Sequence, residues 1–212
     1  MILLFIGPSG SGKDTQAEML SEKFNFERVS SGDLLRDISD GDHKVQKMIR
    51  DGMNEGFLGD DLVYSLIGFY LDRLNSNKVI LSGVVRRNTQ ISLLDKTLEN
   101  INKKIDRVLY FELNDEEAVK RMGGRLFCPK CSSNYHEVFN PPKASGFCDN
   151  CGAALEKRKD DNPEAIRKRL EAFHLANDQI IENYEKRGIL IKIDASKTIE
   201  EIHKDVVEKL GL

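Results

Sequence analysis

A glycine-rich loop close to the N-terminus is the feature that most constrains how this chain folds. Residues 2–6 are a short, wholly apolar run, typical of a strand buried on both faces, and residues 7–15 follow with the sequence GPSGSGKDT. The glycines allow several backbone N–H groups to converge on phosphate oxygens, and the helix expected next adds positive potential at its N-terminus. Lys13 is placed to reach the terminal phosphates of a nucleotide. The GxxxxGK spacing therefore predicts a nucleotide-phosphate site, and the alternative is an ordinary turn with a solvated lysine.

The rest of the chain alternates between segments typical of strands and of helices. Apolar runs predict further strands at 79–82, 108–111 and 189–193, and a weaker one at 27–30. Apolar spacing predicts helices over 60–75, 163–186 and 199–210, and over 115–122, where Asn114 and Glu117 form a capping-box pattern. Alternation of this kind implies an α/β fold, a doubly wound parallel five-stranded sheet with helices on both faces.

Two segments interrupt this alternation. Residues 31–60 contain short helical pieces, several glycines and no strand pattern, while residues 125–162 contain all four cysteines and few apolar side chains. We interpret both as insertions into one core, which consists of residues 1–30, 61–124 and 163–212.

Composition and charge exclude several classes of protein. Of the 212 residues, 40% are hydrophobic and 32% are charged, which is too apolar for a disordered chain and too charged for a membrane protein. The apolar runs are much shorter than the roughly 18 residues of a transmembrane helix, and the N-terminal segment lacks the basic region of a signal peptide. A formal net charge of −3 argues against a protein that mainly binds nucleic acid. We therefore expect a soluble, cytoplasmic protein.

The four cysteines form two CxxC pairs, Cys128/Cys131 and Cys148/Cys151, separated by sixteen residues. In a chain expected to be cytoplasmic, this spacing favours a metal site over disulfides. Four thiolates make a closed tetrahedral site, so we predict structural zinc, with iron as the main alternative. Nearly balanced charges around the cysteines argue against a ribbon that binds nucleic acid. His136 lies between the two pairs, but the histidines show no catalytic pattern and are predicted to be surface or packing residues.

Two further segments place arginines where ligands bind in parallel sheets. The segment SGDLLR at 31–36 follows the second strand, and Arg86 with Arg87 follows the strand at 79–82. Arg36 is suited to holding the phosphate of a second nucleotide, and Asp33 to binding a water on magnesium. Each segment taken alone also fits a simpler interpretation, an ordinary helix start or a pair of solvated arginines.

Taken together, these motifs resemble those of the adenylate kinase family in its long-lid form. The resemblance covers nearly the whole chain and rests on the phosphate loop with Thr15-Gln16, the 31–36 segment, Gly83 with Arg86, Gly124-Arg125, Tyr135-His136 with 139–143, and 158–161 with 167–170. It implies a P-loop NTPase core, a helical nucleoside-monophosphate (NMP) binding domain at 31–60 and a zinc-ribbon-like lid at 125–162. It also implies a monomeric enzyme that transfers the γ-phosphoryl group of MgATP reversibly to AMP, giving two ADP.

The resemblance further implies roles for individual residues. ATP would be bound by Gly10, Ser11, Gly12, Lys13, Asp14, Thr15, Arg121, Arg125 and Lys197. AMP would be bound by Ser31, Arg36, Phe57, Gly59, Gly83, Arg86, Gln90, Arg158 and Arg169, with Gln90 contacting the base. The catalytic cations would be Lys13, Arg86, Arg125, Arg158 and Arg169, which surround the transferred phosphoryl group.

Several residues depart from the family pattern. Ser31 stands where Thr is usual, Phe57 and Gly59 replace residues that commonly flank the AMP base, and residues 82–86 read SGVVR where the family has Asp-Gly-Phe-Pro-Arg. Two departures bear on magnesium. Ser82 stands where the family has an aspartate that helps to hold the waters of magnesium, and Asp14 stands where other P-loop proteins place a magnesium-binding Ser or Thr. We hypothesise that the carboxylate has moved, so that Asp14, beside Asp33, binds Mg²⁺ directly or through a water. The alternative is that Asp14 only faces solvent in the first turn of a helix, where its charge is favourable.

Two other functions stay open on these residues. One is an NMP kinase with another base preference, for UMP or CMP, although the long lid and Gln90 favour AMP. The other is a non-catalytic nucleotide-binding protein, because Ser82 removes a carboxylate from the magnesium site.

Overall fold

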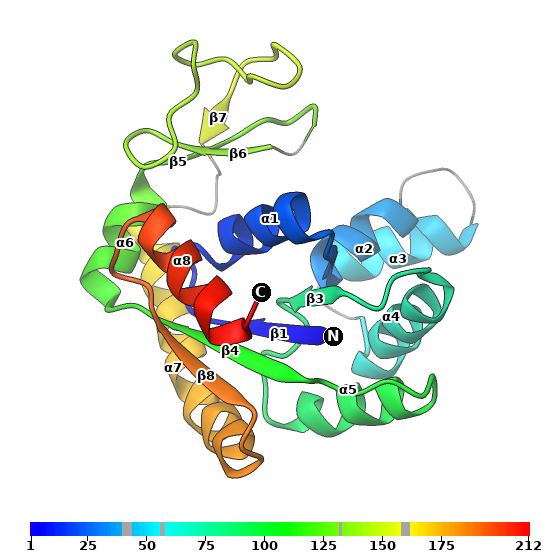
Figure 1. Cartoon of the computed structure of the whole chain (residues 1–212). Helices are drawn as coiled ribbons and strands as arrows, with labels where there is room; N and C mark the ends of the chain where they lie inside the picture. The colour runs from blue at the N-terminus through cyan, green and yellow to red at the C-terminus, as the bar shows by residue number, and fades with distance from the viewer. Residues whose placement is uncertain (40–43, 56–57, 132, 158–161) are drawn as a thin grey trace.

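The computed structural model of the chain describes residues 1–212 apart from 40–43, 56–57, 132 and 158–161. A parallel sheet with the strand order β2-β3-β1-β4-β8 forms its centre (Figure 1). Its strands are β1 (Ile2–Ile6), β2 (Glu27–Ser30), β3 (Val79–Ser82), β4 (Arg107–Glu112) and β8 (Leu190–Asp194). The five strands predicted from apolar runs are thus confirmed, each to within one residue at either end.

Helices cover both faces of this sheet, so the fold is doubly wound as predicted. On one face lie α1 (Lys13–Phe24) and α8 (Ile199–Leu210), and on the other α4 (Asp60–Arg73), α5 (Thr89–Glu99) and α7 (Pro163–Lys186). Leu3 and Phe5 of β1 join the apolar cluster of α1 and α8, whereas Leu4 joins that of α4 and α5. This burial on both faces explains why β1 is an unbroken apolar run. Within the described residues, no helix is both long and apolar enough to cross a membrane.

The register of the central strands brings three loops together at one edge. In the parallel ladders, Phe5 pairs with Ser82 and Ser82 pairs with Ser30. The segments that follow β1, β2 and β3 therefore leave the sheet side by side, at the edge where ligands bind in open α/β sheets. A hydrogen bond of 2.9 Å, donated by the Ser31 hydroxyl to the Gly83 carbonyl, joins two of them directly.

The two interruptions of the alternating pattern have different structures. Residues 31–60 contain α2 (Ser31–Ser39) and α3 (Lys44–Glu55), which pack against each other before α4 begins. Residues 125–162 contain a small antiparallel sheet of order β6-β5-β7, made of β5 (Arg125–Phe127), β6 (Asn134–His136) and β7 (Glu156–Lys157). Figure 1 shows this sheet standing apart from the five-stranded sheet, above α1 and α6 in that view. The boundaries of the two insertions as domains stay a prediction.

The helix caps differ from the sequence pattern at one point. Asn114 caps α6 (Asp115–Gly123) by accepting from the Glu117 N–H at 2.8 Å. The Glu117 carboxylate, however, binds Arg121 at 2.9 Å, so the predicted capping box is only half formed. A complete capping box occurs at Thr198 and Glu201, before α8. The Glu117 carboxylate binds the Arg121 guanidinium and not the Asn114 N–H, because the arginine is a charged partner one helical turn away.

Candidate active site

The glycine-rich loop has the backbone conformation of a phosphate cradle. Gly10 and Gly12 have φ angles of 86° and 77°, in the left-handed region that glycine adopts without strain. A Cβ atom at Gly7 would lie 2.8 Å from the Ser11 hydroxyl, so this turn leaves no room for a larger residue. Gly12 precedes α1 and supplies no side-chain cap, so the first backbone N–H groups of that helix can be satisfied by an anion.

The two unusual residues of the sequence are in direct contact beside this loop. The Ser82 hydroxyl, at the end of β3, donates a hydrogen bond of 2.7 Å to the Asp14 carboxylate in the first turn of α1. Asp14 is exposed at the surface, but the protein around its carboxylate displaces part of the water, and this desolvation alone would raise its pKa. The Lys13 ammonium, the Ser82 hydroxyl and two arginines outweigh that effect and hold the pKa of Asp14 below its ordinary value. One of these arginines is Arg125, at the start of β5. Asp14 is therefore an anion among cations where the loop meets β3.

A second pocket of about 300 Å³ opens at the same edge of the sheet, between the core and residues 31–60. Its apolar lining consists of Leu35, Met53, Leu58, Val63 and Val84. Two arginines lie beside it, since the Arg36 guanidinium lies against Gly32 and the Arg86 guanidinium lies near Gly83. Of the two, Arg86 lines the pocket, whereas Arg36 does not occur among its described lining residues. Cations next to an apolar cavity suit a phosphate that is attached to an apolar ring system.

Another wall of this pocket carries a hydrogen-bond network centred on Gln90. Its side-chain oxygen accepts from the backbone N–H groups of Arg86 and Arg87 at 2.7 and 3.1 Å, and its side-chain nitrogen donates to Asp60 at 2.9 Å. Asp60 also accepts from the Arg87 guanidinium at 2.8 Å. Asp60 was not among the predicted site residues, because its partner Gln90 is 30 positions away and no local pattern connects them.

Arg121 and His136 connect α6 to the small sheet. The Arg121 guanidinium donates to the Ala195 carbonyl at 2.8 Å and lies over the Phe139 ring at 5.3 Å. His136 Nδ1 accepts from the N–H groups of Val138 and Phe139, and Nε2 lies 2.8 Å from the Arg121 carbonyl. Two donors on Nδ1 place the proton on Nε2, and burial lowers the pKa of His136, so the ring is neutral. The sequence indicated only a surface or packing role for this histidine. In the structure, its side chain also joins the small sheet to α6.

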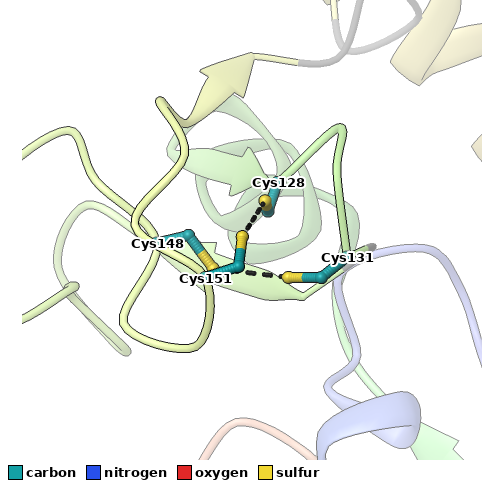
Figure 2. A group of neighbouring side chains, drawn as sticks. All are labelled: Cys128, Cys131, Cys148 and Cys151. Carbon is teal, nitrogen blue, oxygen red and sulfur yellow. Dashed lines mark hydrogen bonds between the residues drawn. The ribbon is translucent and has the colours of Figure 1, made fainter.

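The four cysteine thiols converge beside the small sheet, as Figure 2 shows, with Cys128 and Cys131 between β5 and β6 and Cys148 and Cys151 between β6 and β7. All four sulfur atoms lie within 4.8 Å of one another, and the pairs Cys128–Cys151 and Cys131–Cys148 are 3.4 Å apart. These distances are too long for a disulfide, and they bracket the separation of about 3.8 Å expected in a tetrahedral site with metal–sulfur bonds of about 2.3 Å. A hydrogen bond with the Tyr135 hydroxyl is the main cause that lowers the pKa of Cys148 to about 6, whereas at Cys151 a backbone hydrogen bond at Ala153 is outweighed by contacts with the other three thiols, which raise the pKa to about 12. The cluster can therefore hold a metal ion.

Most of the predicted site residues gather around the loop and the second pocket. Ser31, Gly83, Arg86 and Gln90 line the pocket, whereas Gly59 and Arg169 do not occur among its described lining residues. Gly59 is exposed directly before α4, Arg169 is partly buried on α7, and Lys197 is exposed, 4.0 Å from Asp194. Three predictions lie outside the described residues, namely Phe57, Arg158 and the side chain of Asp33.

A P-loop on a parallel sheet defines the P-loop NTPase fold, and here a second pocket opens at the same edge of the sheet. The family profile described as adenylate kinase matches residues 5–189. Proteins named adenylate kinase from Caldicellulosiruptor bescii and Methanothrix thermoacetophila are 36% and 39% identical to this chain, and each match covers 100% of the chain and 100% or 99% of the relative. Another, from Archaeoglobus fulgidus, is 37% identical over 97% of the chain and 96% of its own length. The chain belongs to the adenylate kinase family, and it is a phosphotransferase of the NMP kinase class.

Removal of the Ser82 hydroxyl is expected to raise the pKa of Asp14. The Ser82→Ala variant loses one of the groups that stabilise the carboxylate, so Asp14 titrates at a higher pH in an NMR titration of the carboxyl carbon. Because the folded-state pKa lies below 3.8, ionised Asp14 stabilises the wild type above that pH, and the contribution disappears as the pH falls through the folded-state pKa. At neutral pH, the Ser82→Ala variant loses part of this contribution of ionised Asp14 to the free energy of unfolding.

The matched control is Ser92→Ala, which removes a hydroxyl that donates to the Thr89 carbonyl within α5. Its Asp14 pKa is expected to equal that of the wild type. An unchanged Asp14 pKa in Ser82→Ala would contradict the role given to this hydrogen bond.

Proposed function

We propose that this chain transfers the γ-phosphoryl group of MgATP reversibly to AMP, giving two ADP, with ATP on the P-loop and AMP in the second pocket. The observation that carries this proposal is the connection of both positions through β3. Ser82 bonds Asp14 of the P-loop helix, and the next residue, Gly83, accepts from Ser31 of the second pocket. Phosphoryl transfer requires the donor and acceptor phosphates to be held next to each other and in line, and this arrangement supports it.

The proposed roles of the cations follow from the charge of the transferred group. Phosphoryl transfer needs positioning and positive charge more than covalent chemistry. We assign Lys13 and the loop N–H groups to the ATP phosphates, and Arg36 and Arg86 to the AMP phosphate. The cations that close on the transferred group are proposed to be Arg125, Arg158 and Arg169. Closure also excludes water, which would otherwise hydrolyse ATP. The other contacts predicted for ATP and AMP stay predictions.

The Arg86→Ala variant is expected to lower kcat by roughly 10²–10³-fold, because a preorganised charge that acts in the transition state contributes about that much. ADP formation from ATP with AMP, CMP, UMP or GMP, followed in a coupled assay, measures both the rate and the base preference. Arg107→Ala removes an exposed cation at the start of β4, away from the ligand edge of the sheet, and is the control. If Arg86→Ala keeps the turnover of the wild type, the assignment of Arg86 to the AMP phosphate is wrong. Preference for UMP or CMP would favour the other NMP kinase, and absence of ADP with every NMP would favour a non-catalytic protein.

The contact between Asp14 and Ser82 also supports a magnesium role for Asp14. Mg²⁺ binds one or two carboxylates together with phosphate oxygens and waters. Asp14 follows the phosphate-binding Lys13, and its carboxylate extends to the end of β3. An anion this close to the ATP phosphates is repulsive unless a cation lies between them. We therefore propose that Asp14 binds the magnesium of MgATP directly or through a water, and the contribution of Asp33 stays a prediction.

A double-mutant cycle tests this magnesium role. Asp14→Gly is expected to raise the magnesium concentration needed for half-maximal kcat, and Ser82→Asp in the same chain is expected to restore part of the loss. Electron paramagnetic resonance of Mn²⁺ added to the protein–ATP complex gives a second measurement, which does not depend on turnover. If Asp14→Gly leaves both the magnesium dependence and Mn²⁺ binding unchanged, Asp14 is a bystander that faces solvent.

We propose that the cysteine cluster holds a structural zinc ion that maintains the lid. Among the described residues of the lid, few side chains are buried. Cys128, Tyr135 and Cys148 form the centre of a small apolar cluster, whereas Val138 and Phe147 are exposed. So small a core contributes little folding free energy, and a metal bound by four thiolates can take its place. Zinc fits the closed four-sulfur donor set, and iron is the alternative.

Elemental analysis is expected to find one zinc per chain. A chelator, or the Cys128→Ser substitution, is expected to lower the melting temperature and to loosen the lid while AMP binding is retained. Phe147→Ala changes an exposed lid residue and is expected to keep both metal and stability. The zinc proposal is wrong if no stoichiometric metal is found, and iron found instead would select the alternative. A monomeric state and a cytoplasmic location stay predictions.

A further inference from the structure

The side-chain amide of Gln90 has a fixed orientation. Its oxygen accepts from two backbone N–H groups, those of Arg86 and Arg87, and its nitrogen donates to the Asp60 carboxylate. The opposite orientation would set the amide N–H groups against backbone donors and its oxygen against a carboxylate. Only one orientation therefore satisfies all three partners.

This network uses the acceptor capacity of Gln90 completely. A side-chain amide oxygen has two acceptor positions, and the backbone of residues 86 and 87 occupies both. One N–H of Gln90 goes to Asp60, which leaves the second N–H for a ligand. Gln90 lines the second pocket, so toward a bound base it can act as a donor and not as an acceptor.

The missing acceptor is present on the neighbouring side chain. A carboxylate has about four acceptor positions, and Asp60 uses two on Oδ1 and one on Oδ2 for Gln90 and Arg87. One position on Oδ2 is left, and Asp60 also lines the pocket, with its side chain 27% exposed. Gln90 and Asp60 thus offer a base one donor and one acceptor side by side.

An adenine base matches this pair in one way. The exocyclic amine of adenine is its one hydrogen-bond donor, and the ring nitrogens N1 and N7, on either side of the amine, are acceptors. We propose that Asp60 accepts from the exocyclic amine of AMP while Gln90 donates to the adjacent ring nitrogen, so that Asp60 selects 6-amino over 6-oxo purines. A 6-oxo purine in the same position would set its carbonyl oxygen against the carboxylate, which is repulsive. This inference rests on the proposal that AMP occupies the second pocket.

The test compares three nucleotides that differ at position 6 of the purine, of which IMP also carries a proton on the ring nitrogen N1. Isothermal titration measures the affinity of the wild type and of Asp60→Asn for AMP, for purine riboside 5′-monophosphate, which lacks the amine, and for IMP, which has an oxo group. In Asp60→Asn, the amide oxygen is expected to keep the contacts that Oδ1 makes with Gln90 and Arg87, while an NH₂ group replaces Oδ2 and the Arg87 hydrogen bond to that atom is lost. AMP affinity is then expected to fall about tenfold or more, as for other hydrogen bonds to charged groups, with no loss for the nucleotide without the amine and a gain for IMP.

The matched control is Asp61→Asn, which removes the same charge from the neighbouring exposed position and is expected to keep wild-type selectivity. ATP affinity, measured on every variant, shows that the P-loop site is intact. If Asp60→Asn weakens all three nucleotides equally, Asp60 only positions Gln90 and the inference is wrong. It is equally wrong if AMP affinity does not change. Failure of the wild type to bind AMP would instead overturn the proposed function.

Discussion

Parallel pairing of β2, β3 and β1 in a single register is the constraint on which the active site depends. Ser30, Ser82 and Phe5 stand next to one another as the last residues, or nearly the last, of their strands. Backbone hydrogen bonds deep in the sheet thereby fix where the three segments that follow these strands begin. The contacts that follow, Ser82 with Asp14 and Ser31 with Gly83, need only short side chains because the ladder has already brought the backbones together. A slip of one residue in the register would separate both pairs and move each side chain of the slipped strand to the opposite face of the sheet.

Patterns that extend over a few residues predicted the elements and the two chemical motifs. Apolar runs marked every strand of the large sheet, the GxxxxGK spacing marked the phosphate loop, and two CxxC pairs marked the metal cluster, since each depends on neighbours in the chain. Contacts between distant residues were not predictable in the same way. The contact of Gln90 with Asp60, and that of His136 with the Arg121 carbonyl, become visible only when the fold places the groups together. Glu117 differs from its sequence pattern as well. Its carboxylate binds Arg121 and so does not complete the capping box with Asn114.

Negative side chains in a site for polyanions need an explanation, and the described residues of this site include Asp14 and Asp60. Asp14 lies among Lys13 and two arginines, which offset its charge, and Asp60 is paired with Arg87. In both cases the carboxylate also accepts from a neutral side chain, Ser82 or Gln90, which fixes its direction. The arrangement limits repulsion toward phosphate while keeping a directed acceptor in place. Selectivity for a cation or for a base can then be obtained without lowering the overall positive potential of the site.

The small sheet of residues 125–157 obtains its tertiary structure from a few buried groups clustered around four sulfur atoms. Side chains such as Val138 and Phe147 point away from that centre and are 73% and 53% exposed. Such a segment responds to mutation unevenly. Exposed positions such as these two are expected to tolerate replacement, whereas loss of one thiol is expected to remove a ligand of the proposed metal site. Over many generations, sequence drift in this part of the chain is therefore expected to be fast at the surface and almost forbidden at four positions.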